Sequence, residues 1–120
     1  MVLTWIKCQN EVWCKLNTVN LSHAHFDNMY GVYVIWHGGP KAATVYVGQG
    51  NIRERLTQHR TNPSMKEFDS LGLYVTWAAV ARPSCDGVEV YLAQQLKPKV
   101  GSSYPEAAPI PVPIPVNIPW

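Results

Sequence analysis

Two runs of β-branched and aromatic residues decide the fold: positions 30–37 (YGVYVIWH) and 44–47 (TVYV). Such residues favour strands, and the turn formers that lie between the two runs favour a tight connection. We therefore expect an antiparallel hairpin. Side chains alternate across a strand, so a suitable register brings Tyr33 of the first run and Tyr46 of the second to the same side of the hairpin.

The residues after the hairpin indicate a helix over positions 52–60. Asn51 can cap its first turn, and Pro63 marks the point by which it must have ended. Arg55 and His59 are four residues apart, so they lie on one face of this helix, separated by a single turn.

Four further segments complete the expected secondary structure. Apolar residues at helical spacing predict a helix over 86–97, the buried run 73–81 predicts a third strand, and 65–71 fits a second short helix. The alternating run 11–16 can add an edge strand at the N-terminal end. The predicted fold class is α+β, a small central antiparallel three-stranded sheet flanked by helices in the order ββαβα.

These elements divide the chain into an N-terminal extension (1–29), a domain (30–101) and an extended Pro-rich tail (102–120). In the tail, prolines alternate with isoleucine and valine. In an extended chain every second residue faces the same edge, and proline has no amide N–H. The prolines therefore all fall on one edge of the tail, while the other edge keeps its N–H donors and can pair with a strand. The tail can then dock along an open sheet edge, or it can remain a disordered polyproline-like extension.

The size and charge of the chain narrow the function classes. Its 120 residues, of which 47% are hydrophobic, suit one domain, and the formal charge is only +2. No stretch approaches the roughly 20 apolar residues that span a bilayer, so we expect a cytoplasmic protein without membrane contact. A local basic patch suggests a phosphate partner, the alternative being a solvated helix face. The patch consists of Arg53, Arg55, His59 and Arg60.

The cysteines predict reduced thiols. Three cysteines without a C-x-x-C pair argue against a disulfide framework and against a structural zinc knuckle. A zinc site from Cys8, Cys14, His23 and His25 has spacing unlike the common sites. We therefore expect buried, reduced cysteines and exposed loop histidines.

Taken together, the motifs resemble the GIY-YIG nucleases, a family that includes intron homing endonucleases and the incising subunit of bacterial excision repair. Positions 31–33 (GVY) look like the first signature tripeptide and 46–48 (YVG) like the second. Arg55 is similar to the family's helix arginine, His59 to its histidine and Glu89 to the glutamate that holds the metal. The resemblance implies a metal-dependent endonuclease that acts on DNA.

The chemistry of phosphodiester cleavage gives these residues roles. Charge on the phosphate must be neutralised, a water deprotonated and the leaving oxygen stabilised. Glu89 would hold Mg²⁺ or Mn²⁺, although it also fits a capping box that starts at Asp86. Arg55 would bind phosphate through its planar fork, or is simply an exposed arginine.

The tyrosines and the histidine would handle protons. The resemblance gives one tyrosine, Tyr33 or Tyr46, the role of general base, and the residues do not choose between them. The alternative is that both are core tyrosines with satisfied hydroxyls. His59 would assist proton transfer or bind a phosphate. The alternative, for a histidine considered without the other site residues, is that it has no functional role.

Two classes of function remain open. In the first, the chain is a DNA endonuclease in which Arg53, Arg60, Lys97 and Lys99 contact the nucleic-acid backbone. In the second, the same scaffold is a catalytically inactive module that binds nucleic acid or a protein. A protein partner or a homodimer is compatible with both classes. For the nuclease, a single active site would cut both strands of duplex DNA only with a second copy of the chain or by two successive nicks.

Overall fold

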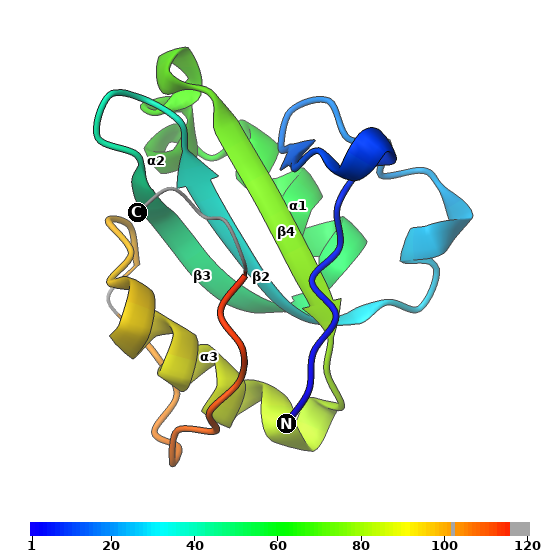
Figure 1. The fold of residues 1–120 in the computed structure, drawn as a ribbon, viewed down its shortest axis with the longest axis vertical. Coiled ribbons are helices and arrows are strands. Elements are labelled where there is room, and N and C mark those ends of the chain that lie inside the picture. The colour runs from blue at the N-terminus through cyan, green and yellow to red at the C-terminus, as the bar shows by residue number, and fades with distance from the viewer. Residues whose placement is uncertain (102, 116–120) are drawn as a thin grey trace.

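The computed structural model describes residues 1–101 and 103–115, and it has an α+β architecture (Figure 1). Four antiparallel strands form one sheet in the order β1-β4-β2-β3. The strands are β1 (Cys14–Lys15), β2 (Tyr30–His37), β3 (Ala43–Asn51) and β4 (Leu73–Ala79). The helices are α1 (Ile52–Thr61), α2 (Pro63–Lys66) and α3 (Arg82–Leu96). The 3₁₀ turns are η1 (Gln9–Glu11), η2 (Ala24–Phe26) and η3 (Asp69–Leu71). The α+β class, the antiparallel sheet and the N-terminal edge strand are confirmed, and with β1 the sheet has four strands.

Several predicted boundaries move for local reasons. Strand β3 is longer than expected because its pairing with β2 continues to the Tyr30–Asn51 pair. Helix α3 begins at Arg82 and not at position 86, because Pro83 is compatible with a first helical turn. The single helix expected over 65–71 is instead the short helix α2 followed by the separate turn η3.

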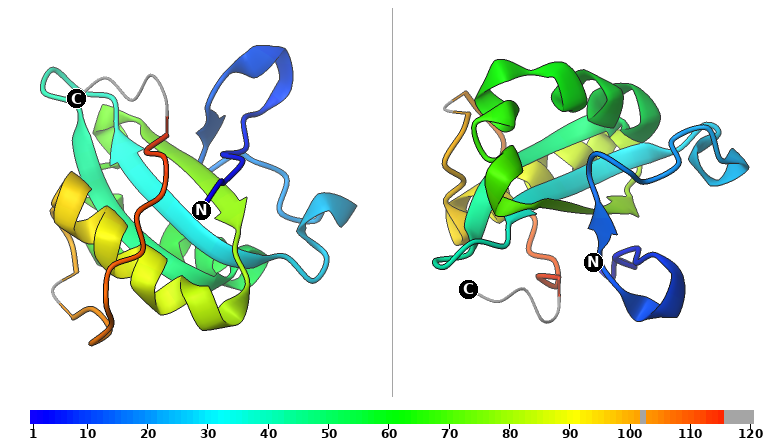
Figure 2. Two further views of the ribbon diagram at one scale, coloured as in Figure 1. Left: turned by 60° about the horizontal axis from the view of Figure 1, so that its bottom comes forward. Right: turned by 90° about the horizontal axis from the view of Figure 1, so that it is seen from above.

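The sheet has a hydrophobic core on each face. On the α1 side, Ile35 and Val75 of the sheet pack with Leu56 of the helix, all fully buried. On the other side, Val34 packs with Leu92 of α3. Figure 2 shows α1 and α2 on one face and the C-terminal tail on the other. The helices therefore sandwich the hairpin from both sides.

The N-terminal segment contributes to this core. Leu16, Leu21 and Phe26 are buried in the α1-side cluster, and the Ile6 amide donates to the Trp77 carbonyl at 3.0 Å. Within the described part of the chain, no helix is long and apolar enough to cross a membrane.

The prediction of reduced cysteines is wrong for two of the three. Cys8 and Cys14 form a disulfide, because η1 folds the chain between them back on itself and brings their Cα atoms to 5.1 Å. Cys85 is a free, buried thiol as expected, and burial raises its pKa to about 11. His23 is exposed, whereas His25 is partly buried and accepts a hydrogen bond from the Trp77 indole.

The described part of the tail, residues 103–115, follows neither of the two predicted courses. No strand forms in it, and it crosses α3 on the side away from α1 (Figure 2, left). The Ile110 amide donates to the Gly87 carbonyl of α3, and the Trp5 indole donates to the Pro113 carbonyl. Val112 is 6% exposed, so burial of the branched side chains holds the tail on the helix. Residues 102 and 116–120 lie outside the described residues.

Candidate active site

Four predicted site residues form one cluster between the hairpin and α1. The Tyr33 hydroxyl lies 2.7 Å from His59 Nε2, and Arg55 Nε donates to the same hydroxyl at 3.3 Å. The Tyr46 ring stacks against Tyr33 with centroids 6.1 Å apart and lies 4.5 Å from the His59 ring. The prediction that both phenols share a face is confirmed. We call Tyr33, Tyr46, Arg55 and His59 the tyrosine cluster.

The register of the hairpin explains this convergence. Tyr33 pairs with Gly48 and Ile35 pairs with Tyr46, which places the two phenols diagonally on one face. A Cβ at position 48 would overlap the Tyr33 hydroxyl, so only glycine lets the phenol cross the strand. Gly50 has φ +135°, a conformation that side chains rarely adopt, and a Cβ at this position would come within 3.0 Å of Arg55 Cγ.

Burial controls the protonation of the cluster. Desolvation raises the pKa of Tyr33. The nearby positive charge of Arg55 lowers this pKa, but burial has the larger effect. Burial, and then the Arg55 charge, lower the pKa of His59 to about 4, so this imidazole is neutral at pH 7. Because Arg55 donates to the Tyr33 hydroxyl, the phenol in turn donates to His59 Nε2. His59 Nδ1 is buried and has no hydrogen-bond partner among the described residues.

The fifth predicted residue, Glu89, lies on α3, which packs against the face of the sheet opposite α1. Gln49 Nε2 donates to Glu89 Oε1 at 2.8 Å and to Asp86 Oδ1 at 2.6 Å. Burial raises the pKa of Glu89, the Gln49 bond opposes this, and the nearby charges of Asp86 and Arg55 act in opposite directions. The carboxylate is 8% exposed. We call Asp86 and Glu89 the carboxylate pair.

The capping-box alternative for Glu89 is wrong. Helix α3 starts at Arg82 with Ala81 as its N-cap, so Asp86 and Glu89 both lie inside the helix. Backbone amides at those positions already bond within the helix, and the Glu89 carboxylate instead accepts from the side chain of Gln49.

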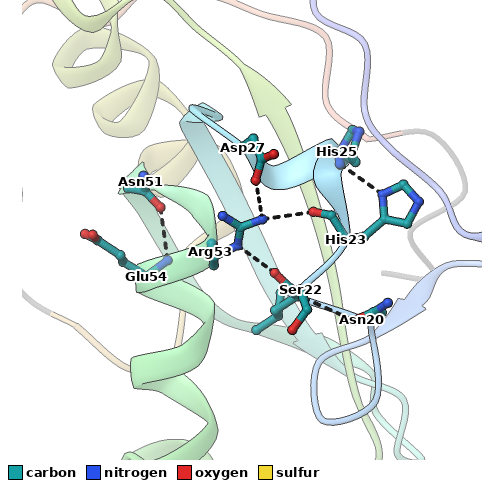
Figure 3. Close-up of polar contacts among 9 residues, drawn as sticks. Asn20, Ser22, His23, His25, Asp27, Asn51, Arg53 and Glu54 are labelled. Atoms are coloured by element: carbon teal, nitrogen blue, oxygen red, sulfur yellow. Dashed lines mark hydrogen bonds and ion pairs between the residues drawn. The ribbon is translucent and has the colours of Figure 1, made fainter.

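The four predicted DNA contacts fall into two pairs, the arginines of α1 and the lysines after α3. Arg53 donates to the Leu21 and His23 carbonyls and pairs with Asp27 at 2.8 Å (Figure 3). Arg60 donates to two carbonyls of the N-terminal segment, those of Leu16 and Val19.

The two lysines lie beyond the end of α3. Lys97 ends the helix in a left-handed conformation with φ 48°, and its side chain is exposed. The amide of Lys99, another exposed residue, donates to the Thr44 carbonyl. Lys97 and Lys99 are thus accessible, whereas Arg53 and Arg60 are engaged within the protein.

Two site residues escaped the sequence reasoning. Gln49 links the edge of β3 to the carboxylate pair, and Asp86 lies one helical turn before Glu89. Gln49 could have been found, because strand alternation places it on the face opposite Tyr46 and Gly48, where α3 packs. Asp86 was read only as a cap, because the true start of α3 was missed.

The carboxylate pair and Gln49 fit a hard divalent cation chemically. Carboxylate and amide oxygens are the ligands that Mg²⁺ and Mn²⁺ prefer. Gln49 now presents its amide nitrogen to both carboxylates, and rotation of the amide would present its oxygen. A cation would also favour the ionised form of Glu89, whose pKa burial raises.

Comparison with known proteins brought no match: no protein-family model, no curated protein and no solved structure matches the chain. Support for a function therefore comes from the geometry of the tyrosine cluster and the carboxylate pair, and from the motif resemblance of residues 30–101.

Proposed function

We propose that the protein is a metal-dependent endonuclease that hydrolyses phosphodiester bonds of DNA, and that β2, β3, α1, β4 and α3 form the ββαβα core of a GIY-YIG nuclease. The observation that carries the proposal is the Tyr33 hydroxyl held between Arg55 and His59, with Tyr46 packed beside it. Residues far apart in the sequence supply the groups that this reaction needs.

Arg55 binds the scissile phosphate in this proposal. Its guanidinium is fixed by bonds to Tyr33 and to Gln58 Oε1, which leave further N–H donors of the planar fork for phosphate oxygens. Burial acts to lower the pKa of Arg55, but the neighbouring phenols of Tyr33 and Tyr46 raise it overall. The arginine therefore keeps its charge beside the monoanionic phosphodiester.

The two tyrosines take different roles. Tyr33 is fully buried, its hydroxyl has two partners and its pKa is raised, so it positions Arg55 and does not act as a base. Tyr46 is only partly buried and is the phenol that can meet a water molecule. We assign the removal of a proton from the attacking water to the Tyr46 phenolate, which forms when the phenol gives up its own proton to solvent. His59 fixes Tyr33 by accepting its proton in a hydrogen bond.

Glu89, with Asp86, would hold Mg²⁺ or Mn²⁺. When bound, the cation would neutralise charge on the phosphate oxygens and stabilise the leaving oxygen. The remaining work belongs to the chain itself: buried Glu89 and exposed Asp86 fix the place of the ion, and Gln49 orients both of them.

Cleavage of labelled linear, branched and single-stranded DNA with Mn²⁺ tests this function. We expect Glu89→Gln to slow cleavage by about a thousandfold. The glutamine has no negative charge to hold the cation, and losing the stabilisation that the cation gives to the transition state costs several kcal/mol. Glu67→Gln, a change at an exposed glutamate after α2, is the matched control and should cut at the wild-type rate. Equal cleavage by wild type and Glu89→Gln would refute the assignment.

A binding module on the same scaffold is the second candidate. The observation that favours it is the engagement of both carboxylates by Gln49, which satisfies them without an ion. In that case the wild type retards DNA in a binding assay but yields no product with Mg²⁺ or Mn²⁺ on any substrate. A cytoplasmic location and a homodimer remain predictions.

A further inference from the structure

A cavity of about 380 Å³ lies at the β1–β4 side of the sheet, whereas β3, which carries the candidate active site, is the opposite edge. Its apolar wall includes the rings of Phe26 and Trp77, whose centroids are 5.0 Å apart, together with Ile6 and Val19. The volume falls within the range of small-molecule sites, roughly 300–1,000 Å³. An aromatic ring therefore fits this wall by size and by chemistry.

Three polar side chains that line the cavity can present hydrogen-bond donors to it. Asn20 Oδ1 accepts from the Ser22 amide, which leaves its NH₂ group as the donor (Figure 3). His23 Nδ1 accepts from the His25 amide, so the proton of this imidazole is on Nε2. His25 Nε2 accepts from the Trp77 indole, so its proton is on Nδ1. The acceptor atoms of all three side chains are already used.

Charge points to the same ligand. Lys7 lines the cavity and holds its ammonium 4.6 Å above the Trp13 ring, while no aspartate or glutamate is among the residues that form the wall. Within residues 1–101 and 103–115, the free donors of Asn20, His23 and His25 have no protein partner. A set of donors with one cation beside aromatic rings is complementary to an anion that carries a planar apolar group.

We propose that this cavity binds a small aromatic monoanion, such as a ring carboxylate, with its ring against Phe26 and Trp77 and its acid group toward Lys7 and the donors of Asn20, His23 and His25. The site is independent of the proposed nuclease activity. The Cys8–Cys14 disulfide is part of its wall and fixes the loop that carries Gln9.

Titration of the ¹⁵N-labelled full-length chain with 1-naphthoate, and separately with neutral 1-naphthamide, tests the proposal by NMR. We expect saturable shifts of the Trp77 indole and Asn20 side-chain signals with naphthoate, and at least tenfold weaker binding of the amide. Lys7→Met should weaken naphthoate binding about fivefold to tenfold and leave naphthamide binding unchanged, because only the charged group meets the ammonium. Lys66→Met, at an exposed lysine of α2, should change neither affinity.

Three results would overturn the assignment. They are equal affinity for the acid and the amide, no saturable shift with naphthoate, and shifts confined to residues around Arg55. The last result would mean that the anion prefers the candidate active site. Because no arm of the experiment measures cleavage, an inactive protein could still bind the probe, and an active one could fail to bind it.

Discussion

The two sides of helix α1 use the same kinds of side chain for different purposes. On one side, Arg53 and Arg60 hold the N-terminal segment through its backbone carbonyls. On the other side, Arg55 and His59 meet the phenols of the hairpin. The sequence presents all four as one basic patch, whereas the fold divides them.

This difference shows that partners, not residue type, decide what an arginine does. Carbonyl partners satisfy the guanidinium of Arg60 within the protein, and Arg53 adds an ion pair with Asp27. The main partner of Arg55 is a phenol that retains its proton, so the arginine's positive charge is not cancelled.

The largest effect that would break this comparison is a loss of stability at Arg60. Arg60→Met should lower the free energy of unfolding by about 3 kcal/mol, because it removes two hydrogen bonds from a charged donor, each worth roughly 1.5–3 kcal/mol. Urea denaturation measures the change. Arg82→Met, which removes only a contact with the Tyr30 ring, should cost less than about 1 kcal/mol. Similar losses in the two variants would contradict a structural role for Arg60.

At Arg55 we expect the next largest effect, on activity and not on stability. Arg55→Lys should slow DNA cleavage about a hundredfold, equivalent to about 2.7 kcal/mol at the transition state, because lysine lacks the planar fork. The free energy of unfolding should change by less than about 1 kcal/mol. Single-turnover cleavage with Mn²⁺, beside Arg82→Lys, measures it. A large loss of stability at unchanged cleavage would place Arg55 with Arg53 and Arg60.

The pH dependence of stability sharpens the comparison at His59. Its pKa is about 4 in the folded chain against 6.5 ordinarily, so between these values the unfolded chain binds the extra proton. The contribution of neutral His59 to the free energy of unfolding is complete above pH 6.5 and is lost as the pH falls to 4. The stability difference between wild type and His59→Gln should therefore shrink by roughly 2 kcal/mol over that range.

Urea denaturation at pH 7 and pH 4.5 measures this difference at His59. Exposed Gln95, changed to asparagine, supplies the background, since neither side chain titrates and the same difference for Gln95→Asn should stay constant. Parallel curves for wild type and His59→Gln would show that the imidazole does not lie buried against Tyr33.

The smallest effect is expected at Arg53. Arg53→Met removes two hydrogen bonds to carbonyls and an ion pair, but it should cost only about 1 kcal/mol. The Arg53 side chain is 36% exposed and that of Asp27 is 60% exposed, so water replaces most of the lost interactions. Added salt screens the ion pair in the wild type, so the stability difference between wild type and Arg53→Met should be smaller at high salt. Urea denaturation at low and high salt measures both. A cost larger than that at Arg60 would reverse the order of the two arginines.

Local patterns were enough to predict the hairpin, α1 and the shared face of the two phenols. Strand alternation and the Asn51 cap act over a few residues, and the Asn51 side chain does accept from the Glu54 amide. The start of α3 was missed because Asp86 fits a capping box, whereas the helix begins four residues earlier, at Arg82. Gly87 lies inside the helix, where a Cβ would come within 2.7 Å of the Ala108 carbonyl oxygen of the tail.

The site was predictable only in part for the same reason. Tyr33, Tyr46, Arg55 and His59 belong to neighbouring elements, so their spacing already favours contact. The bond from Gln49 to the carboxylate pair joins residues 37 and 40 positions apart, and no local pattern specifies it. The Cys8–Cys14 disulfide depends on a non-helical turn at Asn10, where φ is 61°.

The amino-acid sequence by itself determined the strands, the capped helix and the kinds of group available for chemistry, because periodicity and capping are local properties of the chain. Only the tertiary structure decided which arginines are engaged by carbonyls, where the tail lies and which phenol loses contact with solvent. Those outcomes follow from burial and from partners brought together over long separations, and desolvation by such partners sets the protonation of Tyr33, His59 and Glu89.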